Sequence, residues 1–224
     1  RSHKTGKPWQ ECGQPSAGNG AILRIAPMLI PHLRSGGTDL WADTALSAMI
    51  THNDAASIAA SLAFTGMLWQ LLGMEAQPEP EWWLWPYVDT ARELEKEKAY
   101  RTRGGSFEDY HGPLSQVVEE KVGGAYEQGL TIREACEHWR SGAYLLETMP
   151  SVIYILMQYG ADPEEAIVRA VNDTKDNDTV AAIVGAAVGA LHGRDKIPER
   201  WISALSGRTT SRDDGRIFEI LIEA

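Results

Sequence analysis

The chain has 224 residues, a formal net charge of −10 and an ordinary apolar fraction of 43%. The length fits one large domain, and the negative charge argues against a partner bound through a nucleic-acid backbone, which needs clustered Lys and Arg. Two cysteines, Cys12 and Cys136, are too few for a disulfide framework and favour a reducing, cytoplasmic setting. No apolar run approaches the roughly 18 residues of a membrane span, and the first residues do not resemble a signal peptide. We expect neither a membrane nor a nucleic-acid partner.

Helical periodicity predominates along the chain. Residues 39–50 and 54–72 are rich in Ala and other helix formers. The second range is apolar on most faces, which predicts a buried central helix that ends at Gly73. Further helices are predicted at residues 114–126, 145–159, 163–171, 180–191, 198–205 and 216–223. The sequence therefore predicts an all-α fold, with one domain over residues 1–224.

Residues 75–112 differ from the rest of the domain. The segment opens with clustered prolines and tryptophans and continues with a charged helix, predicted at 89–101, and a Gly-rich turn. We interpret it as an insertion or surface excursion. Its tryptophans either line a partner surface or, the more common case, pack the excursion onto the body.

An acidic loop precedes the small-residue helix predicted at 180–191. Asp176, Asp178 and the Thr179 hydroxyl offer three oxygens from one turn, and oxygen ligands are what Mg²⁺ prefers. A cation at a helix start is mildly disfavoured by the helix dipole, so the carboxylates must outweigh it. The alternative is that Asp178 is only an N-cap and the other acids are solvated.

A second candidate site is the Gly18-Asn19-Gly20 loop. Two glycines around Asn19 leave backbone N–H groups uncovered, and a helix predicted to start at Ala21 would point its positive end outward. This suits a diphosphate or ribose oxygens, although an ordinary loop would look the same. His52 stands before a predicted helix cap at Asn53 or Asp54, and it is equally well read as a structural residue or as a ligand contact.

These segments occur in the order found in one known family. The four blocks are Ser16 to Pro27, with its Gly-Asn-Gly-Ala core; Thr51-His52-Asn53-Asp54; Ser141-Gly142-Ala143-Tyr144 with Glu147-Thr148; and Asp176 to Trp201, with Gly185 and Gly189. In this combination the chain resembles the Mg²⁺-dependent ADP-ribosylglycohydrolases, which include dinitrogenase-reductase-activating glycohydrolase. The resemblance implies an all-α hydrolase domain with two Mg²⁺ ions.

The resemblance also implies roles for single residues. Asp176, Asp178 and Thr179 would bind the metal, and Ser16, Gly18, Asn19, Gly20 and His52 would contact ADP-ribose. Family members carry an upstream Thr-Asp-Asp-Thr segment that supplies the other half of the metal site, and nothing before Ser16 matches it. We therefore expect this chain to lack an upstream part of the domain, which would contain the catalytic base and could be a separate piece. Made alone, the chain is expected to have little or no hydrolase activity. The catalytic residue is not identified.

The expected activity is hydrolysis of the glycosidic bond between ADP-ribose and its acceptor. The substrate would be an ADP-ribosylated protein or a small ADP-ribosyl molecule. The alternative is a non-catalytic relative that binds ADP-ribose or serves a structural, crystallin-like role. Calorimetry with ADP-ribose and Mg²⁺, together with an assay of ADP-ribose release, would separate an enzyme, a binder and a structural protein.

Overall fold

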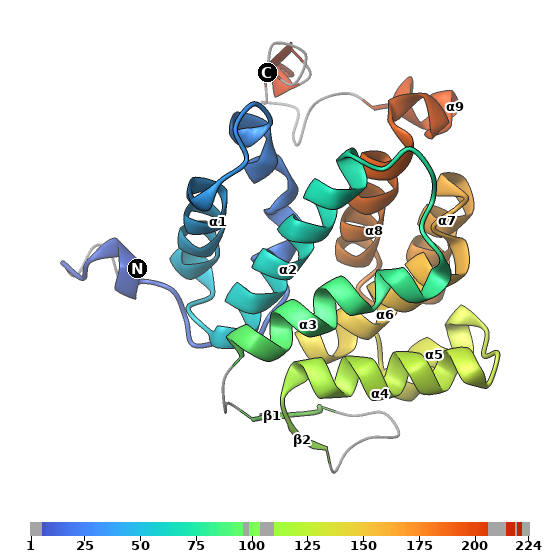
Figure 1. The fold of residues 1–224 in the computed structure, drawn as a ribbon, viewed down its shortest axis with the longest axis horizontal. Helices are drawn as coiled ribbons and strands as arrows, with labels where there is room; N and C mark the ends of the chain where they lie inside the picture. Colours follow the sequence, from blue (N-terminus) through green and yellow to red (C-terminus); the bar gives the residue numbers. More distant parts are fainter. Residues whose placement is uncertain (1–5, 96–98, 104–109, 206–213, 218, 221–224) are drawn as a thin grey trace.

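The computed structural model describes the chain except for residues 1–5, 96–98, 104–109, 206–213, 218 and 221–224. Its α-helices are α1 (Thr38–Thr51), α2 (Ala55–Leu72), α3 (Trp85–Leu94), α4 (Leu114–Glu127), α5 (Ile132–Trp139), α6 (Leu145–Tyr159), α7 (Pro163–Asp173), α8 (Asn177–His192) and α9 (Glu199–Ile202). Short 3₁₀ helices are η2 (Trp9–Glu11), η3 (Ile22–Arg24), η4 (Ala26–His32), η5 (Pro80–Trp83) and η6 (Arg194–Lys196). The all-α prediction is confirmed (Figure 1).

Two helices form the centre of the fold. α2 packs against α1, α3 and α8, and α6 packs against α4, α5, α7 and α8 (Figure 1). Every side chain from Leu145 to Met157 of α6 is buried, so this helix has neighbours on all sides. The predicted range 145–159 matches α6. Burial on all sides makes α6 a core helix.

The helix α2 also has the composition of a membrane span. Its mean hydropathy is 1.5 over 18 residues, but 67% of it is buried inside the fold. This corrects the expectation from the sequence that no apolar run approaches that length. Asp54 is the N-cap residue of this helix. Its Oδ1 accepts the N–H of Ala56 at 3.0 Å and so satisfies one of the unpaired amides of the first turn.

The segment 75–112 packs largely onto the body. Trp83 in η5 is 2% exposed, and its ring fits against Gly160, where a Cβ would lie 2.7 Å away. Tyr87, Val88 and Ala91 of α3 are fully buried. The predicted charged helix ends at Leu94, and the short antiparallel strands β1 (Tyr100–Arg101) and β2 (His111–Gly112) follow, with Tyr100 opposite Gly112.

Several of the predicted helices need correction. The helix expected from Ala21 is only the 3₁₀ turns η3 and η4, which contain Pro27 and Pro31, and proline removes the N–H donors that a longer helix needs. α5 was not predicted, because it is short and its charged residues are interspersed with the few apolar ones. α8 begins at Asn177, before the predicted residue 180. The helix predicted at 216–223 lies partly outside the described residues.

Candidate functional site

The turn at Gly18-Asn19-Gly20 connects three segments that are far apart in the sequence. The Asn19 side chain is buried, and its Nδ2 donates to Asp176 Oδ2 at 2.5 Å and to Thr148 Oγ1 at 2.9 Å. The backbone N–H of Asn19 donates to the carbonyl of Ala143 at 3.2 Å. One buried amide therefore holds residues 16–20, 142–148 and 173–179 together.

His52 covers the same turn. A Cβ at Gly20 would lie 2.7 Å from His52 Cε1, and one at Gly18 would lie 3.0 Å from Nε2. The imidazole can approach this closely only because both neighbours are glycine. Ser57 Oγ donates to the carbonyls of Ser16, at 2.9 Å, and Gly18, at 3.2 Å. His52 and Ser57 thus pack against the turn at residues 16–20.

The electrostatics of the turn differ from the expectation in one respect. With the 3₁₀ turn η3 in place of an α-helix, the helix dipole contributes little positive charge. Arg24 does not supply the charge either, since its guanidinium donates to Ser47 and Thr51 of α1. Burial, and to a smaller extent the charge of Arg24, lowers the pKa of His52, which favours the neutral form of this ring.

The acidic loop places its carboxylates at the start of α8. Asp176 holds the N-cap position but makes no side-chain capping bond; its carboxylate accepts from Asn19 instead. Asp178 is exposed in the first turn, and its Oδ1 accepts the N–H of Thr179, which is 8% exposed. The alternative that Asp178 is the N-cap is therefore wrong.

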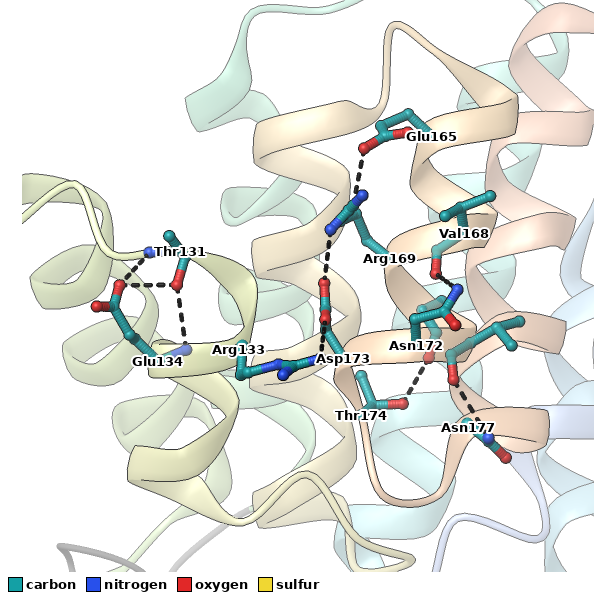
Figure 2. Close-up of polar contacts among 12 residues, drawn as sticks. Thr131, Arg133, Glu134, Glu165, Val168, Arg169, Asn172, Asp173, Thr174 and Asn177 are labelled. Atoms are coloured by element: carbon teal, nitrogen blue, oxygen red, sulfur yellow. Dashed lines mark hydrogen bonds and ion pairs between the residues drawn. The ribbon is translucent and has the colours of Figure 1, made fainter.

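A separate polar network fixes the position of this loop (Figure 2). Asp173, at the end of α7, accepts from Arg169 at 3.1 Å and from Arg133 of α5 at 3.3 Å, and its side chain is only 7% exposed. Thr174 Oγ1 donates to the carbonyl of Ala170 at 2.6 Å, and Asn177 Nδ2 donates to that of Val171 at 3.2 Å. The loop is thus anchored at both ends to α7.

Comparison with known proteins identifies the family. The sequence model of the ADP-ribosylglycohydrolase family matches residues 1–223. The chain belongs to this family. The match begins at residue 1, and it gives no support to the expectation that an upstream part of the domain is missing.

Family relatives are similar but longer. ADP-ribosylhydrolase ARH3 of Bos taurus is 26% identical over 210 residues, which cover 87% of this chain and 55% of the relative. The ADP-ribosyl-[dinitrogen reductase] glycohydrolase of Rhodospirillum rubrum is 27% identical over 189 residues, 84% of this chain and 51% of the relative. The chain thus spans about half the length of these curated relatives.

A solved structure shares the fold. The structure of an "ADP-ribosylglycohydrolase-related protein complex" superimposes with a TM-score of 0.65 at 24% identity, over 92% of this chain and 61% of that one. The helical architecture therefore recurs in a protein whose name refers to the same family.

The oxygens at the start of α8 suit a hard cation in kind. Asp176 is the N-cap residue of α8, but its carboxylate accepts no capping hydrogen bond from the first turn. That carboxylate therefore remains close in sequence to the oxygens of Asp178 and Thr179 without a backbone partner in the described loop. Within the described ranges, however, no cluster of three or more His, Cys, Asp or Glu side chains is arranged to hold a metal. Mg²⁺ takes about six oxygens, so these three residues alone would not complete its coordination sphere.

Sequence reasoning missed several residues of the site. Glu147 and Thr148 were recognised as part of a motif but were given no role, although Thr148 binds Asn19. The turn before them contains Arg140 and Ser141, both with positive φ, 77° and 47°. Neither is glycine, so the sequence carried no signal of this conformation.

Proposed function

We propose that this member of the family hydrolyses the glycosidic bond between ADP-ribose and an acceptor, with Mg²⁺, as two ions, for its cofactor. The substrate would be an ADP-ribosylated protein or a small ADP-ribosyl molecule in the cytoplasm. The observation that carries the proposal is the bond from Asn19 to Asp176, because it brings the ADP-ribose candidates and the metal candidates to one place.

Each residue has a role that follows from its chemistry. Asp176 and Asp178 would contribute charge, and Thr179 a neutral oxygen, to the cation. When bound, Mg²⁺ would hold ribose hydroxyls and polarise a water molecule. Asn19 orients the Asp176 carboxylate, and neutral His52 can donate or accept one hydrogen bond to the ligand.

The backbone around the glycines completes the ligand side of the proposed site. Ser16 and Gly18 turn their carbonyls toward Ser57, which fixes the path of the chain. Gly20 leaves the ring of His52 in contact with the backbone. We assign Ser16, Gly18, Asn19, Gly20 and His52 to ADP-ribose on this basis.

Release of ADP-ribose from a modified protein tests the proposal. The chain with Mg²⁺ is expected to release it, and the chain with a chelator is not. Asn19→Ala is expected to lower the rate by about tenfold to a hundredfold, the usual effect of losing a residue that orients a metal ligand. Gln70→Ala is the matched control, since Gln70 is exposed and its amide donates to the carbonyl of Gly66 in the same helix. Release that is unaffected by the chelator would contradict the metal assignment.

The second candidate is a non-catalytic ADP-ribose binder. It is favoured by the absence of a three-residue metal cluster in the described part of the chain. Calorimetry with free ADP-ribose and Mg²⁺ separates the two candidates. Binding heat together with release of ADP-ribose supports the enzyme, and heat without release supports the binder.

A further inference from the structure

A second feature lies directly beside the proposed site. A cavity of about 390 Å³ is lined by Arg103, Arg140, Gly142, Glu147, Lys175 and Asp176. We call it the Arg140 pocket. Asp176 belongs both to this pocket and to the proposed metal site, so whatever occupies the pocket lies next to a bound ribose. Neither Gly20 nor His52 lines it.

The wall of the pocket is a strained but well-fixed turn. Arg140 and Ser141 both have left-handed backbone conformations, which cost energy in a non-glycine residue and tend to occur at functional sites. The buried Ser141 holds the turn, because its carbonyl accepts from the N–H of Asp176 at 3.0 Å and its Oγ from that of Lys175 at 3.1 Å. At Gly142 a Cβ would meet Glu147 Oε2 at 2.3 Å. The wall is therefore built around the carboxylate of Glu147.

The lining of the pocket combines three cationic side chains, Arg103, Arg140 and Lys175, with the two carboxylates of Glu147 and Asp176. In the described part of the chain none of Arg103, Arg140 and Lys175 has a carboxylate within 4.0 Å. The guanidinium of Arg103 lies 4.1 Å from the centre of the Tyr144 ring, and Arg140 Nη1 donates to the carbonyl of Arg103 at 3.0 Å. These contacts orient both arginines and leave their charges for a ligand.

The floor of the pocket has an unused hydrogen-bond acceptor. Glu147 is 4% exposed, and its Oε1 is buried with no hydrogen-bond partner among the described residues. Burying a polar atom without a partner costs free energy. A ligand that brings an N–H to this oxygen would remove that cost.

We propose that the Arg140 pocket receives the acceptor part of the substrate and selects an acidic acceptor peptide over a basic one. This rests on the proposed function. The bond to be broken joins the distal ribose to the acceptor, so the acceptor must lie next to the ribose that Asp176 would help to hold. An acidic peptide offers carboxylates to the three cations and backbone N–H groups to Glu147 Oε1. A guanidinium would be repelled by the same cations.

The diphosphate of ADP-ribose is a second anion of a kind that three cations attract. Its expected place is against Gly20 and His52, which are outside the lining of the Arg140 pocket. The experiment below distinguishes the two sources of negative charge.

Binding measurements with three probes test the inference on the whole chain, with Mg²⁺ present. The probes are free ADP-ribose and two peptides that carry ADP-ribose through a non-hydrolysable linkage, one flanked by glutamates and one by lysines. The glutamate peptide is expected to bind roughly five to ten times more tightly, the scale of two or three exposed ion pairs, and the ratio should shrink with added salt. In the double variant Arg140→Gln/Lys175→Gln the ratio should fall to near one, with free ADP-ribose bound as before.

Controls separate the outcomes. Arg34→Gln removes an exposed arginine outside the pocket and should keep the ratio. Lys175→Gln alone should lower it in part, and because Lys175 is exposed this variant serves if the double variant does not fold. A ratio near one in the parent chain, or one unchanged in the variants, overturns the inference and leaves the proposed function standing. Loss of free ADP-ribose binding in the variants assigns the pocket to the diphosphate and also overturns it. If the folded parent chain binds no ADP-ribose at all, the proposed function itself fails.

Discussion

Two carboxylates at the two ends of one short loop have opposite surroundings. Asp173 is nearly buried and accepts from two arginines, Arg133 and Arg169 (Figure 2). Asp176, at the start of α8, has no arginine or lysine in ion-pair contact within the described residues, and its partner is the neutral amide of Asn19. Among the described residues, the first carboxylate is thus paired with two arginines, whereas the second has no ion pair. A carboxylate of the second kind is a candidate for a ligand or a metal.

The largest effect of this difference is expected at Asp176. Asp176→Asn keeps the size of the side chain and an oxygen that can accept from Asn19, so the free energy of unfolding should change by less than about 1 kcal/mol. Loss of one ligand charge should lower the rate of ADP-ribose release by at least about a hundredfold, or roughly 2.7 kcal/mol in the barrier. Rates with and without added Mg²⁺ would measure it. A variant with the parent's rate and metal affinity would show that Asp176 is not a metal ligand.

At Asp173 we expect a substitution to lower the stability of the fold and to have little effect on metal binding. Asp173→Asn leaves Arg169 and Arg133 without their shared partner, and a hydrogen bond to a charged group contributes about 1.5–3 kcal/mol. Because both arginines are partly exposed, at 35% and 68%, we expect the lower end, about 1–2 kcal/mol, in the free energy of unfolding measured with urea. Mg²⁺ affinity should fall by no more than about tenfold, through the position of the loop.

Glu165→Gln is the matched control for this variant. Glu165 contacts the same Arg169, at 2.7 Å, but its side chain is 38% exposed, and exposed ion pairs contribute little. We expect a change of at most about 0.5 kcal/mol. If Glu165→Gln destabilises the protein as much as Asp173→Asn does, burial is not what distinguishes the two carboxylates.

The helices could be predicted from the sequence because their signals are local. Apolar runs set the range of α6, and an Asp at position 54 marks the start of α2. Boundaries failed where a non-local contact decides them. α8 begins at Asn177 because the chain there is tied to α7 and to Ser141, and neither contact is visible in the local pattern.

The sequence indicated which loops carry the candidate residues, but not the hydrogen bonds that connect these loops. The loops at residues 16–20 and 173–179 were each recognisable from their residue types. The hydrogen bond between them, from Asn19 to Asp176, joins residues that are far apart in the sequence. The sequence assigns Glu147 no role, because a glutamate in the first turn of a helix is common. Only the fold buries it beside Gly142 and places three cations around it.

The smallest effect is expected at Glu147, in the pH dependence of the free energy of unfolding. This carboxylate is buried like Asp173 but has no ion pair among the described residues, like Asp176. Burial raises its pKa, and Arg140, Arg103 and Lys175 oppose that rise without cancelling it. A raised pKa in the folded state means that folding favours the protonated form. The stability from this group is therefore complete below its usual pKa of 4.5, and it is lost as the pH rises through the folded-state pKa. Glu147→Gln cannot ionise, so its free energy of unfolding relative to the parent should rise over that range and then level off.

Urea unfolding curves of both proteins from pH 4 to 8 would measure the difference. Glu137→Gln, which removes an exposed carboxylate, is the control for net charge. If the parent gains on the variant as the pH rises, the cations stabilise the ionised form more than burial opposes it, and Glu147 belongs with Asp173 as a neutralised carboxylate.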